Sequence, residues 1–90
     1  MKTFTDLIFN PHPRVPGLKA RLMFENGFGI DVVLGNLFIS NGINTYEVVI
    51  LGKNGFIYDK DPNITGIYGH VTKDGVISIM EQIQKFEPVK

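Results

Sequence analysis

The sequence predicts an α+β fold: a mostly antiparallel sheet of four to five strands, packed by one C-terminal helix. Two alternating apolar patterns, over residues 18–34 and 45–58, each turn back on themselves at an Asn-Gly pair, which is typical of β-hairpins. From residue 73 the apolar period changes from two to about 3.6 residues, as in an amphipathic helix. The 90 residues are expected to form a single domain, residues 1–90.

The amino-acid composition limits the kinds of molecule that this protein is expected to bind. A chain of 90 residues buries only about 60 to 65% of the surface it exposes when unfolded, so we expect a homo-oligomer. Nine Lys and Arg balance nine Asp and Glu without a run of either sign, which argues against nucleic-acid binding. The chain has no cysteine, and no apolar run approaches the roughly 18 residues that a membrane span needs. We therefore expect a protein or a small molecule as partner, and no membrane.

The chain begins with an apolar segment and a proline-rich segment. Residues 4–9 are predicted to form a short first strand. Residues 10–17 follow with three prolines, which cannot donate ladder hydrogen bonds. We expect this second segment to be a rigid connector.

The sequence of the first hairpin, residues 18–34, predicts how its two strands are paired. A two-residue Asn26-Gly27 loop would place the apolar sets of the two strands on opposite faces. A three-residue loop over 25–27 instead forms one apolar face, with the pairs Phe24 and Phe28, Leu22 and Ile30, Ala20 and Val32, and Leu18 and Leu34. This register also sets Arg21 opposite Asp31 and uses Gly27 for the positive φ of a G1 bulge. We predict the three-residue loop.

The second hairpin is predicted over residues 45–58. Its first strand, 45–51, carries apolar residues on both faces, which indicates either a central place in the sheet or a second face that is covered by a neighbour. The chain is expected to turn at 52–55 and return through 56–58. The preceding segment, 35–44, mixes turn residues with large apolar ones, so it forms either a packed loop or a short edge strand.

The helix is predicted over residues 73–86. Thr72 suits the N-cap, and Asp74 suits the positive end of the helix dipole. The positions at helical spacing on one face are Val76, Ile79, Met80, Ile83 and then Phe86 or Glu87. Pro88 is expected to stop the helix.

No set of side chains predicts a metal site or catalysis. Asp59, Asp61 and Asn63 resemble the first ligands of a calcium loop, but the Gly and the final Glu of such a loop are missing. The only histidines, His12 and His70, have no partner that the sequence can place beside them. The only serines, Ser40 and Ser78, lack the context of a nucleophile. We expect no enzyme activity, no metal and no cofactor.

A patch of apolar side chains is a candidate contact surface. Val33, Phe38, Val49 and Leu51 are expected to lie exposed on the sheet. Such a patch would mark a contact with another protein or a homodimer face.

Several strings resemble small uncharacterised proteins of tailed bacteriophages and prophages. The strings are FENGFGIDVV (24–33), TYEVVIL (45–51), YD (58–59) and GHVT (69–72), the last leading into the helix. The resemblance extends over most of residues 4–86. The chain departs from the pattern at Asp31, in a longer turn before Ile64, and in the less acidic helix start over 73–75. The resemblance implies a phage protein acting in the cytoplasm of the bacterial host.

A phage setting changes the expected function. Small phage proteins without an enzyme signature look like modules that bind and inhibit a host protein, for example in a defence system such as CRISPR. Two alternatives are a self-associating phage scaffold or accessory component, and a protein that sequesters a signalling nucleotide. The candidate binding residues are His12, Arg14, Phe38 and Tyr68, of which His12, Arg14 and Tyr68 could supply charge and stacking.

Overall fold

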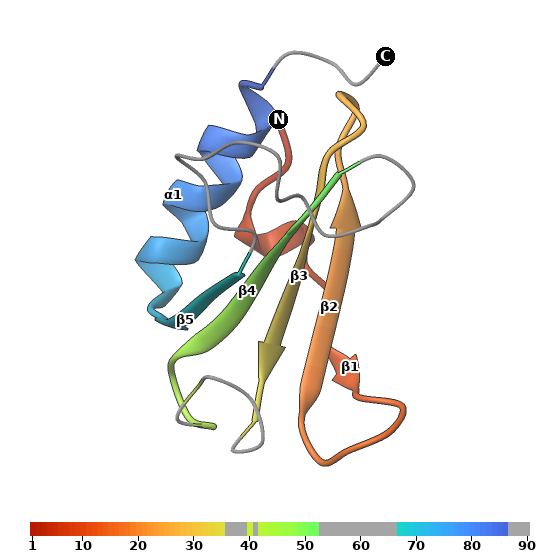
Figure 1. Cartoon of the computed structure of the whole chain (residues 1–90), viewed down its shortest axis with the longest axis vertical. Helices are drawn as coiled ribbons and strands as arrows, with labels where there is room; N and C mark the ends of the chain where they lie inside the picture. The colour runs from red at the N-terminus through yellow and green to blue at the C-terminus, as the bar shows by residue number, and fades with distance from the viewer. Residues whose placement is uncertain (36–39, 41, 53–66, 87–90) are drawn as a thin grey trace.

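The computed structural model describes residues 1–35, 40, 42–52 and 67–86. Five strands form one antiparallel sheet in the order β1-β2-β3-β4-β5, so each strand lies beside its neighbour in sequence (Figure 1). The predicted α+β fold is confirmed. The elements are η1 (Phe4–Asp6), β1 (Asn10–Pro11), β2 (Leu18–Met23), β3 (Gly29–Leu34), β4 (Tyr46–Leu51), β5 (Ile67–Val71) and α1 (Lys73–Gln84).

The first hairpin has the predicted register. Arg21 lies opposite Asp31, and all the apolar pairs from Leu18 with Leu34 to Leu22 with Ile30 are observed. The loop is closed by Phe24, whose N–H donates to the Phe28 carbonyl at 2.7 Å. Gly27 has a φ of 89°, which a residue without a Cβ adopts at little cost. The three-residue loop is thus confirmed.

The N-terminal segment is not the predicted strand over 4–9. Residues Phe4–Asp6 form the short 3-10 helix η1. The Thr3 N–H donates to the Asp6 carboxylate at 2.7 Å, and the Asp6 N–H donates to the Thr3 carbonyl at 2.9 Å. This exchange of hydrogen bonds across one turn competes with an extended conformation.

Aromatic packing explains why the turn prevails over a strand. Phe4 and Phe9 both pack on Tyr46, with ring centroids 6.1 and 5.9 Å from that of the tyrosine. In a strand, residues five apart point to opposite faces, so one of these rings would leave the core. The turn lets both rings contact the same side of the sheet.

The first strand lies instead within the expected connector. Asn10 pairs with Lys19 and Pro11 with Leu18, and the His12 N–H donates to the Gly17 carbonyl at 2.8 Å. Proline is tolerated here because β1 is an edge strand of two residues.

The partner of β4 also differs from the expectation. The predicted return strand, 56–58, and most of the 35–44 segment lie outside the described residues. β4 pairs with β3 on one side and with β5 on the other, so its central place is confirmed. β5 was not predicted because its pattern is irregular: Gly69 is followed by His70, which has a positive φ of 50°, and the register with β4 shifts.

The helix α1 begins as predicted and ends two residues early. The Thr72 side chain accepts a hydrogen bond from the Gly75 N–H at 3.2 Å, as an N-cap does. At the other end the Lys85 and Phe86 N–H groups bond to carbonyls three residues back, which tightens the last turn and ends the helix before Pro88.

The core lies between α1 and one face of the sheet. Val76, Met80 and Ile83 of the helix are at most 1% exposed and pack on the apolar face of the strands. Val32 and Val48, in the middle of the sheet, are completely buried. Among the described residues, no helix has the length and apolar character to cross a membrane.

Candidate functional site

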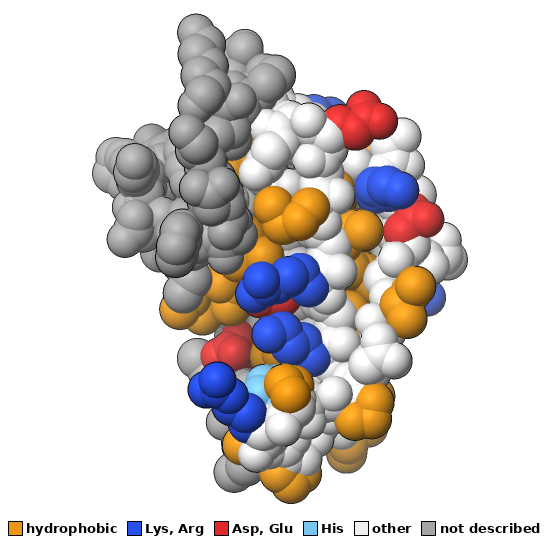
Figure 2. Space-filling view, turned by 90° about the vertical axis from the view of Figure 1, so that its right-hand side faces the viewer, with side chains coloured by type: hydrophobic (Ala, Val, Ile, Leu, Met, Phe, Trp, Pro, Cys, Tyr) orange, Lys and Arg blue, Asp and Glu red, His pale blue; other side chains and the backbone are white. Residues whose placement is uncertain are grey.

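The sheet face turned away from α1 carries the polar half of the first hairpin. Alternation along β2 directs Lys19, Arg21 and Met23 to this face, called here the outward face, because Ala20 and Leu22 pack in the core. Figure 2 looks onto the β2 side of the molecule and shows Lys and Arg side chains gathered there, with acidic side chains beside them.

A charged cluster occupies the centre of the outward face. Arg21 Nε donates to Asp31 Oδ1 at 3.0 Å, and Arg21 Nη2 donates to Asp31 Oδ2 at 2.8 Å. Lys19 Nζ lies 3.9 Å from the same Oδ2. Hydrogen bonding and charge from Asp31 raise the pKa of Arg21. Two cations share one carboxylate, so the cluster has a net positive charge.

The two members of the ion pair differ in exposure. The Asp31 side chain is 11% exposed, whereas the Arg21 side chain is 50% exposed. Two of the five guanidinium N–H groups of Arg21 bond to Asp31, and no other described residue accepts from the remaining three. Arg21 therefore presents an oriented cation to solvent.

The loop between β1 and β2 adds a third cation. Arg14 is exposed, and its N–H donates to His12 Nδ1 at 3.1 Å. When neutral, the His12 imidazole therefore carries its proton on Nε2. This half-buried ring orders the loop at the Lys19 end of β2. We call Arg14, Lys19 and Arg21 the basic patch.

The structure separates the residues that the sequence singled out for binding. His12 and Arg14 follow β1, at one edge of the sheet, whereas Tyr68 lies on β5, at the other edge. Tyr68 pairs with Val48 and packs half-buried on the core side. Within one chain these three residues do not meet. Phe38 lies outside the described residues.

The expectation of an exposed apolar patch is wrong for two of its members, because their side chains are buried. Val33 is 6% exposed and Leu51 is 1% exposed, and Val49 is half-buried. Val33 and Leu51 thus form no exposed contact surface. By alternation the side chains of Val33 and Leu51 point to the outward face. The outward face is therefore buried at these positions of β3 and β4, and it is polar along β2.

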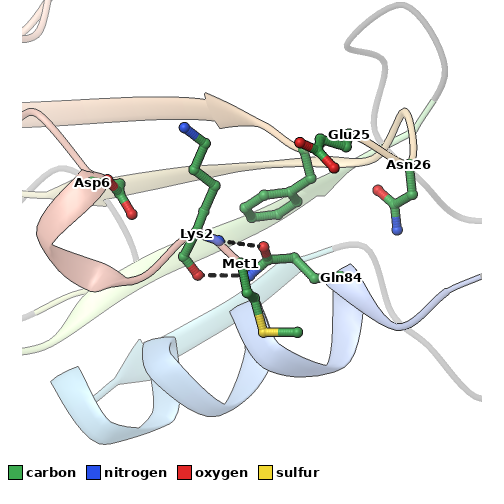
Figure 3. A pocket seen from close by; sticks show the side chains of 7 residues that line it. Met1, Lys2, Asp6, Glu25, Asn26 and Gln84 are labelled. Carbon is green, nitrogen blue, oxygen red and sulfur yellow. Dashed lines mark hydrogen bonds between the residues drawn. The ribbon is translucent and has the colours of Figure 1, made fainter.

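A groove of about 710 Å³ lies between the N-terminal segment, the β2–β3 turn and the end of α1 (Figure 3). The Gln84 amide donates to the Lys2 carbonyl at 2.8 Å and accepts from the Lys2 N–H at 2.7 Å. The Asn26 amide donates to the carbonyls of Ile83 and Phe86, at 2.8 and 3.3 Å.

The polar groups of this groove are used for structure. Both amides hold backbone segments together, and the Asp6 carboxylate accepts from the Thr3 N–H, which lowers the pKa of Asp6. The remaining charges, Lys2 against Asp6 and Glu25, are of both signs. The groove has the size of a ligand site but no convergent set of groups for one ligand.

The structure shows the role of one serine and the outcome for metal-binding clusters in the described part of the chain. Ser40 is buried, and its hydroxyl bonds to the backbone of Gly35 and Gly42 at 3.0 to 3.2 Å, so it serves as a loop anchor. In residues 1–35, 40, 42–52 and 67–86, no group of three His, Cys, Asp or Glu side chains could hold a metal ion.

The basic patch was only partly visible in the sequence. The register predicted the contact of Arg21 with Asp31, and the alternation of Lys19 with Arg21 placed both on the polar face. What the sequence did not predict is that β1 pairs beside Lys19 and brings the Arg14 loop to the same end of β2. Comparisons with family models, curated proteins and solved structures found no match to the chain.

Proposed function

We propose that this chain is a non-enzymatic binding module that docks its basic patch on an acidic surface of another protein. The observation that supports the proposal is the Arg21–Asp31 pair, which holds an exposed guanidinium in one orientation. A preorganised arginine loses less conformational entropy on binding, and it can form two hydrogen bonds with a partner carboxylate.

The charge balance favours a protein over a nucleic acid as the partner. Asp31 neutralises one of the three cations of the basic patch, and the chain as a whole has a net charge of zero. Binding to a nucleic-acid backbone depends on several uncompensated cations along a groove. Binding to a small acidic protein surface needs fewer uncompensated cations.

The resemblance to phage proteins suggests the class of protein to which the partner belongs. We propose a host protein in the bacterial cytoplasm, for example a component of an anti-phage defence system such as CRISPR, which this chain would inhibit by covering its surface. A small-ligand function has less support, because the groove beside Gln84 places Lys2 near two carboxylates and so disfavours a phosphate group.

The test is affinity capture from nuclease-treated lysate of the bacterial host. The variant Arg14→Glu, Lys19→Glu reverses two charges of the basic patch and leaves the Arg21–Asp31 pair in place. The variant Lys2→Glu, Lys85→Glu makes the same change in net charge near the end of α1, away from the basic patch. Circular dichroism checks that both variants fold.

We expect one host protein to be retained in a stoichiometric amount by the unmodified chain and by the Lys2, Lys85 variant. The Arg14, Lys19 variant should retain about tenfold less, because reversed rim charges repel the partner. Equal retention by the two variants would refute the basic patch as the docking surface. Retention of no host protein by the unmodified chain would refute the host-protein proposal.

A further inference from the structure

The turn between β2 and β3 contains an Asn-Gly pair, the dipeptide in which asparagine loses its side-chain amide most readily. In this reaction the main-chain nitrogen of the following residue attacks the asparagine Cγ, and glycine has no side chain that would hinder the approach. Of the Asn-Gly pairs in the sequence, only the first lies entirely within the described residues. The three pairs are Asn26-Gly27, Asn41-Gly42 and Asn54-Gly55.

Hydrogen bonds hold both reacting groups of the first pair. The Gly27 N–H donates to the Phe24 carbonyl at 3.1 Å, so the proton that this nitrogen must lose is bound. The Asn26 side chain points from the turn toward the end of α1, where its amide nitrogen donates to two carbonyls at 2.8 and 3.3 Å (Figure 3). Its oxygen accepts from the Phe28 N–H at 3.1 Å. Movement of Cγ to the Gly27 nitrogen would break these bonds.

We propose that Asn26 is a deamidation site that the folded chain protects and that local opening exposes. When the end of α1 separates from the turn, the Gly27 nitrogen forms a bond to Asn26 Cγ. The bond from Cγ to the amide nitrogen breaks, and ammonia leaves with the proton from Gly27. Water then adds to one of the two carbonyl carbons of the resulting succinimide and opens the ring, which yields aspartate or isoaspartate at position 26.

The opening that exposes the site is local to the end of the helix. The Phe86 ring follows α1 and packs on Phe28, with ring centroids 5.1 Å apart. The end of a helix opens at a lower free energy than the core of the protein. Because opening and closing are fast relative to bond formation, the rate of deamidation follows the population of chains that are open at this end.

The product cannot restore the original contact. A carboxylate at position 26 has no N–H to donate to the Ile83 and Phe86 carbonyls, and it faces the negative end of the helix dipole. Chains that have opened therefore become modified, and modified chains open more easily. This site is separate from the basic patch and does not depend on the proposed docking function.

The test follows deamidation of the purified full chain at mildly alkaline pH by tandem mass spectrometry of its peptides, which assigns the change to each asparagine. The folded chain is compared with the chain unfolded in urea. A synthetic peptide of residues 22–30, incubated with and without urea, corrects for any effect of urea on the reaction. In the unfolded sample all three Asn-Gly pairs should react at similar rates, because glycine follows each asparagine.

We expect Asn26 to react at least about tenfold more slowly in the folded chain than in urea, since opening breaks its three hydrogen bonds. A rate in the folded chain equal to that in urea would show that these contacts do not protect the site. That result, or the absence of reaction at Asn26 in urea, would overturn the proposal.

A pair of variants tests whether the end of the helix controls access. Phe86→Ala removes the ring that packs on Phe28, so it should speed the reaction of Asn26 in the folded chain by about tenfold. Lys85→Ala, at an exposed residue beside it, is the matched control and should leave the rate unchanged. Circular dichroism checks that both variants fold. An equal rate in the two folded variants would contradict control by the helix end.

The stability of the product tests the second part of the proposal. In a chain with Asn41→Gln and Asn54→Gln, only the pair at Asn26 remains, and the deamidated form can be separated by its added negative charge. This form should melt at a lower temperature than the same chain before deamidation. Equal melting temperatures would show that the modification does not weaken the contact with the helix, and the proposal would fail.

Discussion

Asn26 connects the first hairpin to the end of the helix, and its replacement tests how the two are joined. Its amide donates to the carbonyls of Ile83 and Phe86, at 2.8 and 3.3 Å, and its Oδ1 accepts from the Phe28 N–H at 3.1 Å. Asn26→Asp keeps the acceptor and a good turn residue, but it removes the donor. Asn26→Ala removes all three hydrogen bonds.

The expected losses follow from these contacts. Each hydrogen bond contributes about 0.5 to 1.5 kcal/mol, so the loss of three in Asn26→Ala should lower the free energy of unfolding by about 1.5 to 4.5 kcal/mol. Asn26→Asp loses only the two bonds to the helix, but a carboxylate there faces the negative end of the helix dipole, which adds up to about 1 kcal/mol and a desolvation cost. At pH 7 we expect Asn26→Asp to be the less stable variant.

The pH dependence of the stability of Asn26→Asp distinguishes the charge penalty from a simple loss of hydrogen bonds. The helix carbonyls disfavour the charged form, so the pKa of the introduced carboxyl group is higher in the folded than in the unfolded chain. The penalty is present at neutral pH and disappears below the ordinary value of about 3.9. Urea unfolding followed by circular dichroism at pH 7 and pH 4 measures it, with Glu25→Ala as an exposed control. An Asn26→Asp variant as stable as the unmodified chain at pH 7 would refute the reasoning.

Three further predictions concern single sites. Gly29→Ala should cost about 1 to 3 kcal/mol, because a Cβ would lie 2.9 Å from a backbone carbonyl and overlap Met23 Sδ; thermal melting unaffected by it would contradict this. Ile83→Ala should cost about 2 to 5 kcal/mol in urea unfolding, whereas Ile43→Ala, at an 80% exposed side chain, should cost almost nothing. A backbone hydrogen bond lowers the pKa of Asp6, so its NMR titration should fall below 3.8. Its contribution to stability is then present above that value and lost as the pH falls through the lowered pKa; a midpoint at or above 3.8 would contradict it.

Local signals in the sequence were sufficient for the hairpin and the helix. The apolar alternation, the positive φ required at Gly27 and the Arg21–Asp31 pair all favour one register, so they predicted it before any tertiary contact was known. The N-cap of Thr72 and the 3.6-residue period predicted the start of α1 in the same way. Each of these choices depends on residues close in sequence.

The candidate site depended on contacts that the sequence does not contain. Its centre, Arg21 with Asp31, lies within one hairpin and was predicted. Arg14 joins it only because β1 pairs with β2, and two residues ending in a proline give no strand pattern. The separation of Tyr68 from His12 likewise follows from the order of five strands, which alternation within single strands does not encode.

The sequence by itself determined the fold class, the first hairpin with its register, the helix and its apolar face, because the hydrophobic period and the turn residues act locally. The tertiary structure alone decided the rest. The packing of Phe4 and Phe9 on the same side of Tyr46 replaced the expected strand over 4–9 with η1. Tyr46 lies on β4, far from both rings in sequence, so no local pattern reveals this contact.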